Sequence, residues 1–336
     1  MNESASSSHP PRNLVGNILR ALLSFSLLAL LMVRIGPSAL VGTLSRLQMW
    51  AIPVLVGLFA VFLLIGGVNL WILIQTRKPV PVAALLKSFC VSTSLGMYSP
   101  AQVGEFTLVF MLRSHGISIR EGLSMQFVDK AITLGAGVIL SIVAVKVYLP
   151  PQPWLMAFFI MVLGGLVVLS LLVWIPDTRN FINRAVIHSR WIIGHYEFFR
   201  AASDLFRHHT MALGLNVIIT FGRLALGAAT IYVAFAAFGR SMSYIDVLLI
   251  NTLARLTTLI PVSLNGIGVL ETTAFYLFRQ LGIPGSDTLC AFLVNRIIVY
   301  TFGIMVITMA SGRVLQEVEA WRRQFRDGKI FNGHRK

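Results

Sequence analysis

The chain has 336 residues, of which 56% are hydrophobic and only 12% are charged, with a formal net charge of +15 at pH 7. A soluble domain carries roughly 25% charged residues, so this composition excludes a sizeable soluble domain and predicts a polytopic membrane protein. The basic residues cluster at the ends of apolar segments. That distribution is typical of membrane topology and anionic-lipid contact rather than of nucleic-acid binding.

The chain begins with a short Ser-rich stretch, 1–13, that lacks a small-residue cleavage site after the first apolar run. We therefore expect a disordered cytoplasmic N-terminus rather than a signal peptide. The apolar runs that follow are long enough to cross a hydrocarbon core about 30 Å thick. They predict six full spans, at about 14–34, 51–75, 119–148, 153–175, 211–238 and 287–312.

Two further apolar segments are interrupted by turn residues. The first, 81–112, is broken near Pro100, and the second, 244–281, is broken between Pro261 and Gly268. Each arm has roughly 11–18 residues, which at about 1.5 Å per residue is short for a full crossing. We therefore predict two re-entrant helical hairpins, whose tips are buried in protein or line a wet cavity.

The two interrupted segments belong to an internal repeat with an offset of 166 residues, in which the intervals 8, 3, 1, 12 and 1 recur. The first copy contains Glu105, Arg113, Gly116, Ile117, Asp129 and Lys130, and the second contains Glu271, Arg279, Gly282, Ile283, Asn295 and Arg296. Charge in the bilayer is costly and is kept mainly for function, so an internal repeat with ionisable residues inside apolar segments favours a transporter.

Basic residues predict the orientation. The segment 176–210 and the tail 313–336 are rich in Arg and should both be cytoplasmic. Counting spans from these segments places the first hairpin on the inner side and the second on the outer side, which defines an inverted-topology repeat. We therefore predict an all-α polytopic protein with one transmembrane domain, 14–312. Repeat one spans about 51–148, repeat two about 211–312, and the linker is a basic amphipathic segment.

The hairpin tips are candidate binding sites. A helix that begins inside the membrane presents free N–H groups and the positive end of its dipole, which favours an anionic group such as a lipid phosphate. Glu105 and Glu271 begin the second arms, where they either handle a cationic headgroup or protons, or stabilise their own helices. Further polar contacts at the tips are predicted from Ser99, Gln102, Ser263 and Asn265. Hinge or gate positions are predicted at Pro100, Gly104, Pro261, Gly266 and Gly268.

Four more basic residues fall within predicted spans or hairpins. They are Lys130, Arg223, Arg255 and Arg296. Unpaired, each would cost a few kcal/mol or more at the bilayer centre. Arg can hold phosphate through two parallel hydrogen bonds, so the three arginines form a candidate headgroup cradle.

The alternative to a binding role for these charges is internal ion pairing. The candidate pairs are Lys130 with Asp129 or Glu105, and Glu271 with Arg255 or Arg296. Asn295 stands in the second copy where the first has Asp129, which makes the second half more basic. In an asymmetric site we expect the outer half to hold phosphate more strongly.

The segment from Ser94 to Phe106, followed by Asp129-Lys130, resembles the first hallmark of the lysylphosphatidylglycerol synthase transmembrane-region family, and the segment from Pro261 to Glu271 resembles the second. The resemblance implies a flippase-like protein of the bacterial or archaeal cytoplasmic membrane. In the best understood members this region moves an aminoacylated phospholipid between leaflets. Those members add a cytoplasmic aminoacyl-transferase domain, which we do not expect here, because few residues follow the last predicted span; we therefore do not expect this chain to make lysylphosphatidylglycerol alone.

The leading functional hypothesis is a lipid flippase or lipid transporter without enzymatic activity. The expected partners are membrane lipids, namely an anionic or aminoacylated phospholipid or a polyprenyl phosphate. A lipid-synthesis enzyme and a second copy of the chain are further candidate partners. Nucleic acid is not expected to bind. No cofactor or metal is predicted, because the two cysteines lie in apolar segments and no nucleotide-binding loop occurs. The alternatives are a membrane-embedded transferase acting on a lipid-linked substrate and a scaffold for a separate enzyme.

Overall fold

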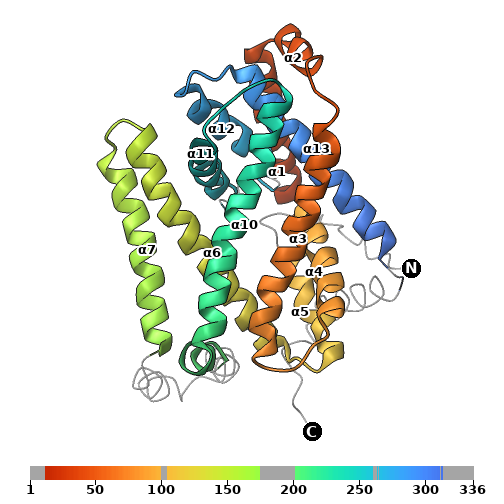
Figure 1. Ribbon diagram of the computed structural model, residues 1–336, viewed down its shortest axis with the longest axis vertical. Helices are drawn as coiled ribbons and strands as arrows, with labels where there is room; N and C mark the ends of the chain where they lie inside the picture. Colours follow the sequence, from red (N-terminus) through yellow and green to blue (C-terminus); the bar gives the residue numbers. More distant parts are fainter. Residues whose placement is uncertain are drawn as a thin grey trace, which may run out of the picture.

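The computed structural model describes residues 12–99, 104–174, 201–259, 263, 265–310 and 312, and these residues form helices and turns with no strand (Figure 1). The elements are α1 (Arg12–Ile35), α2 (Pro37–Leu44), α3 (Ala51–Gln75), α4 (Val82–Met97), α5 (Thr107–Leu112), η2 (Arg113–His115), α6 (Ile119–Tyr148), α7 (Pro153–Trp174), α10 (Thr210–Ala237), α11 (Tyr244–Leu256), η3 (Thr257–Leu259), α12 (Val269–Arg279) and α13 (Gly285–Met309). The all-α class predicted from the sequence is confirmed.

Five described helices are long and apolar enough to span a membrane, namely α3, α6, α7, α10 and α13. Helix α3 begins and ends where the second span was predicted, and α6 does so for the third. The first predicted span, 14–34, lies within α1, but α1 continues into α2 through a bend of 87° that was not predicted. The bend has a local cause, since Gly36 has a φ of 93° and Pro37 occupies the first turn of α2, and neither residue continues a helix.

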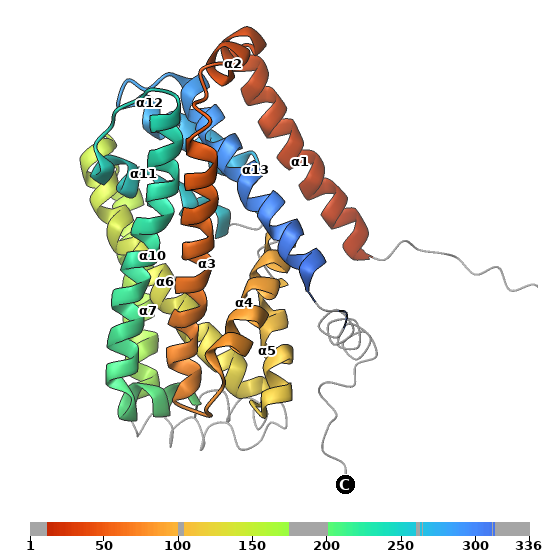
Figure 2. The same cartoon turned by 45° about the vertical axis from the view of Figure 1, so that its right-hand side comes forward.

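The two interrupted segments form two pairs of short helices at opposite ends of the molecule. Helices α4 and α5 contact each other in the half of the molecule that also contains the C-terminal end of α3. Helices α11 and α12 contact each other in the opposite half (Figure 2). The arrangement agrees with two oppositely oriented hairpins, and their re-entrant insertion into a bilayer stays a prediction.

The internal repeat is visible in the backbone as well as in the sequence. Helix α13 begins 166 residues after α6, the same offset as the charge pattern. The turns before the two helices contain Gly116 with a φ of 76° and Gly282 with a φ of 73°. In both turns the amides of this glycine and of the next residue, Ile117 or Ile283, donate to carbonyls of the preceding helix end. This is the left-handed glycine termination that ends many helices.

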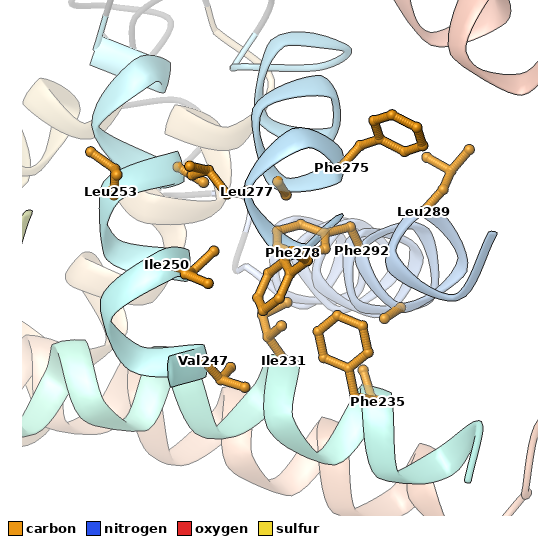
Figure 3. Packing of buried hydrophobic residues seen from close by; sticks show 14 of the residues in the cluster. Ile231, Phe235, Val247, Ile250, Leu253, Phe275, Leu277, Phe278, Leu289 and Phe292 are labelled. Atoms are coloured by element: carbon orange, nitrogen blue, oxygen red, sulfur yellow. The ribbon is translucent and has the colours of Figure 1, made fainter. Parts of the chain in front are cut away.

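The second pair of short helices is fixed by an apolar cluster between α10, α11, α12 and α13 (Figure 3). Phe278 of α12 is fully buried against Phe235 of α10, with ring centroids 4.8 Å apart, and against Phe292 of α13 at 6.1 Å. Lipid tails are as apolar as these side chains, so close van der Waals packing supplies most of the stabilisation inside a membrane. The cluster therefore sets the position of α11 and α12, which carry the predicted site residues Arg255 and Glu271.

Several predictions concern segments outside the described residues. These are nearly all of the N-terminal stretch 1–13, the tail beyond residue 312 and the linker up to residue 200. The end of the linker is described, with residues 201–208 helical. Arg77, two residues after the end of α3, forms an ion pair with Asp204 of this helical segment at 2.7 Å.

Candidate functional site

A cavity of about 480 Å³ lies between helices of both repeats. Much of its wall is apolar, with Phe59, Phe62 and Phe89 among the residues that form it. The charged side chains that line it in the described part of the chain are Glu105, Asp129, Lys130, Arg223, Arg255, Glu271 and Arg296. Asn251, Asn265 and Asn295 also line it. All seven charged residues, together with Asn265 and Asn295, were candidate site residues from the sequence, so the structure brings most of that set together.

The first repeat contributes an ion pair between Lys130 of α6 and Glu105. Glu105 lies in the helical turn just before α5, and its carbonyl accepts a hydrogen bond from Gln126 Nε2 at 2.9 Å. Gln126 and Lys130 are four residues apart on α6 and therefore share one face. Helix α6 thus holds the start of the second arm through both the backbone and the side chain of Glu105.

The second repeat contributes the equivalent ion pair, between Arg296 of α13 and Glu271 of α12. Arg296 Nε donates to Glu271 Oε1 at 2.6 Å, and Glu271 Oε2 accepts from the Gly268 amide at 2.8 Å. Glu271 therefore caps the start of its own helix and pairs with an arginine, as one of the two sequence hypotheses stated. Arg296 also donates to the Tyr300 hydroxyl at 3.2 Å and lies 5.8 Å from the centroid of its ring.

Asp129 is paired differently from the sequence hypothesis that joined it to Lys130. Its Oδ1 accepts from the side-chain amides of Asn69 and Asn216, each at 3.0 Å, and its Oδ2 lies 3.9 Å from Arg223. Consecutive helical residues point about 100° apart, so Asp129 faces α3 and α10 while Lys130 faces the first hairpin. Sequence reasoning missed Asn69 and Asn216, although each is a lone Asn in an apolar span, which is a usable signal.

Arg255 has a different environment from the other basic residues of the cavity. Its Nε donates to Asn251 Oδ1 at 3.4 Å. Of the two partners that the sequence left open for Glu271, Arg255 and Arg296, the structure has Arg296. Within the described ranges Arg255 has no carboxylate within ion-pair distance.

The two predicted serines do not line the cavity. Ser99 Oγ donates to the Gly96 carbonyl at 3.0 Å and accepts from the Gly104 amide at 2.7 Å, so it closes the turn of the first tip. Ser263 is buried, and its hydroxyl has no hydrogen-bond partner among the described residues. Gln102, Pro100 and Pro261 lie outside the described residues.

The predicted gate glycines occupy tightly packed positions. A Cβ atom at Gly104 would lie 2.5 Å from the Leu95 carbonyl oxygen, and one at Gly268 would lie 2.6 Å from the Ser24 carbonyl oxygen of α1. Gly266 and Gly268 also have positive φ angles, of 73° and 80°. These glycines allow close approach of the hairpin tips to neighbouring backbone. Their role in gating stays a prediction.

The helices and the shared cavity define a multi-pass α-helical membrane protein with ionisable groups enclosed between two repeats. The chain belongs to the family described as "Lysylphosphatidylglycerol synthase TM region", whose model matches residues 17–307. It is also similar to a "UPF0104 membrane protein" of Methanothermobacter thermautotrophicus, with 24% identity over 326 residues, covering 89% of this chain and 95% of that protein. No solved structure matches the chain. The resemblance drawn from the two motifs is confirmed at the level of the family.

Proposed function

We propose that this protein is a lipid transporter that moves a polar headgroup through the cavity while the lipid tails stay in the bilayer. One observation carries the proposal: the two hairpins, at opposite ends of the molecule, each contribute a Glu–basic ion pair to one cavity. Two similar units of opposite orientation can open a shared site to either side in turn. A membrane anchor would not need such a site.

Each ion pair supports this proposal because it joins the second arm of a hairpin to the helix that follows. Glu105 lies just before α5 and pairs with α6, and Glu271 of α12 pairs with α13. Movement of a hairpin would separate the carboxylate from its basic partner. A lipid phosphate can then replace the carboxylate on Lys130 or Arg296, so headgroup binding and hairpin movement are coupled through differential binding to two states.

The apolar part of the wall supports the same proposal. Aromatic residues of α3 and α4 line the cavity beside the charged groups, so a headgroup and the first carbons of its tails meet different surfaces. We expect the protein to act in a bacterial or archaeal cytoplasmic membrane, with both termini in the cytoplasm. The candidate substrates are phospholipids, aminoacylated phospholipids and polyprenyl-linked lipids.

The test is headgroup accessibility in proteoliposomes. Fluorescent phosphatidylglycerol, an aminoacylated analogue and a polyprenyl phosphate are compared for the wild type and the double variant Glu105→Gln/Glu271→Gln. We expect the wild type to move at least one lipid class and the double variant to lose that movement, because both carboxylates are neutralised.

The matched control is Glu121→Gln. Glu121 lies outside the cavity and its side chain accepts from the Ser118 amide at 3.1 Å in a capping box, a role that Gln can also fill. Transport that persists in a normally abundant double variant would refute the roles given to the two carboxylates. A folded wild type that moves none of the lipids would refute the transporter proposal and favour a transferase or a scaffold.

A further inference from the structure

Three of the four basic side chains that line the described cavity lie beside a carboxylate, and one does not. This difference indicates which headgroup charge the cavity favours. We infer that Arg255 is an anion subsite that selects a headgroup with a single net negative charge over zwitterionic and cationic headgroups. The inference rests on the proposed function, since it names the substrate class of the same cavity.

Every carboxylate that lines the described cavity already has a basic partner. Glu105 pairs with Lys130, Glu271 pairs with Arg296, and Asp129 lies beside Arg223. Four basic and three acidic side chains line it among the described residues, so one positive charge is left over. The pairing pattern assigns that charge to Arg255.

The surroundings of Arg255 leave its guanidinium available to a ligand. A guanidinium has five N–H donors, and the one side-chain acceptor found for it among the described residues is Asn251 Oδ1, on the same helix at 3.4 Å. An enclosed charge without a counter-ion is costly. A phosphate oxygen pair can accept two parallel hydrogen bonds from such a group and supply the missing negative charge.

A headgroup ammonium finds no unpaired carboxylate in the described cavity. Each of the three carboxylates that line it lies beside a basic side chain. Two of the aromatic rings that line the cavity already hold a cation, because Arg223 lies 5.5 Å from the Phe62 ring centroid and Arg296 lies 5.8 Å from that of Tyr300. An aminoacylated or zwitterionic lipid would therefore place its ammonium in the cavity without a counter-charge, whereas a singly anionic phosphodiester completes the charge balance.

The test measures binding to the full-length protein in detergent by fluorescence competition. Four lipids are compared: phosphatidylglycerol, a polyprenyl phosphosugar, phosphatidylcholine and lysylphosphatidylglycerol. We expect the wild type to bind an anionic phosphodiester at least about tenfold more tightly than the zwitterionic and cationic lipids, as a charge-assisted contact implies. The first two lipids distinguish a glycerolipid source of the phosphodiester from a polyprenyl source.

Two variants and a control locate the effect. Arg255→Gln should lose the charge preference, and Arg255→Lys should keep it with weaker affinity because an ammonium cannot bind phosphate bidentately. Arg279→Gln, an exposed arginine of α12 outside the cavity, should behave like the wild type. If Arg255→Gln does not fold, the wild-type preference and the Arg255→Lys result still decide the matter.

Equal wild-type binding of phosphatidylglycerol and phosphatidylcholine would overturn the inference, and so would a preference that survives in folded Arg255→Gln. Either result would leave the transporter proposal standing if proteoliposomes still move lipid. Binding that depends on Arg255, in a protein that moves no lipid, would support the subsite and refute transport. The two claims therefore fail separately.

Discussion

The ion pair of the first hairpin and that of the second have the same spacing of 25 residues but different surroundings. The side chains of Lys130 and Glu105 are 44% and 16% exposed, whereas those of Arg296 and Glu271 are 14% and 1% exposed. The second pair is also bonded to the Gly268 amide and the Tyr300 hydroxyl. Both repeats thus contain the ion pair, but the second pair is more deeply buried and has more hydrogen bonds. We therefore expect the second pair to contribute more to the stability of the fold than the first.

The largest expected effect is a difference in protein stability when the basic partner of each ion pair is replaced. Arg296→Met leaves the buried Glu271 without its partner, which should lower the free energy of unfolding by about 3–5 kcal/mol. Lys130→Met leaves a carboxylate with access to water and should cost less than about 1 kcal/mol. The measurement is the unfolding midpoint and slope in mixed detergent for both variants. Similar losses would mean that the two pairs are equivalent.

A smaller effect is expected at Asp129, whose counterpart in the second repeat is Asn295. Asp129→Asn removes the charge that Asn69, Asn216 and Arg223 surround, and should cost roughly 1.5–3 kcal/mol. The measurement is the same unfolding free energy in a double-mutant cycle with Arg223→Gln. A variant within the error of the wild type would show that the surrounding dipoles, not the charge, hold α3, α6 and α10 together.

The smallest expected effect is a loss of stability that should be equal in the glycine turns of the two repeats. Gly116→Ala and Gly282→Ala each force a Cβ atom into a left-handed conformation, at a cost of about 1–2 kcal/mol. The new atom would meet only the flexible end of Lys78 at Gly116 and open space at Gly282, so backbone strain dominates both. Gly164→Ala, in the interior of α7 with open space around it, is the control and should be neutral or stabilising. A clear difference between the two turns would sharpen the contrast between the repeats.

Much of the architecture is predictable because the membrane imposes length and apolarity on each span. The bounds of α3 and α6 were predicted to the residue, and those of α7, α10 and α13 within three residues. The sharp bend at Gly36 and Pro37 was not predicted, although both residues signal a break. The predicted span 14–34 ends just before the bend, so the length of the apolar run did not indicate the short helix α2 that follows at an angle.

The candidate site was predictable as a set of residues, whereas the ion pairs were predictable only as alternatives, Lys130 with Asp129 or Glu105 and Glu271 with Arg255 or Arg296. Charges that recur at one offset in apolar segments pointed to Glu105, Lys130, Glu271 and Arg296, because isolated charges are costly there. The partner of Asp129 depended on which way adjacent helical residues face. Asn69 and Asn216 carry no charge and stood out only by their apolar neighbours, so they entered the site through the contact of α3 and α10 with α6.

The sequence by itself determined the helical class, the family, the repeat and the identity of the charged residues, because these follow from apolar length, periodic spacing and motif. Only the tertiary structure decided which carboxylate neutralises which base and therefore which cation is left over. Pairing depends on side-chain direction and on distances of a few ångströms between helices far apart in the chain. For this reason Arg255 is distinguished from the other basic residues that line the described cavity by its lack of a carboxylate partner among the described residues.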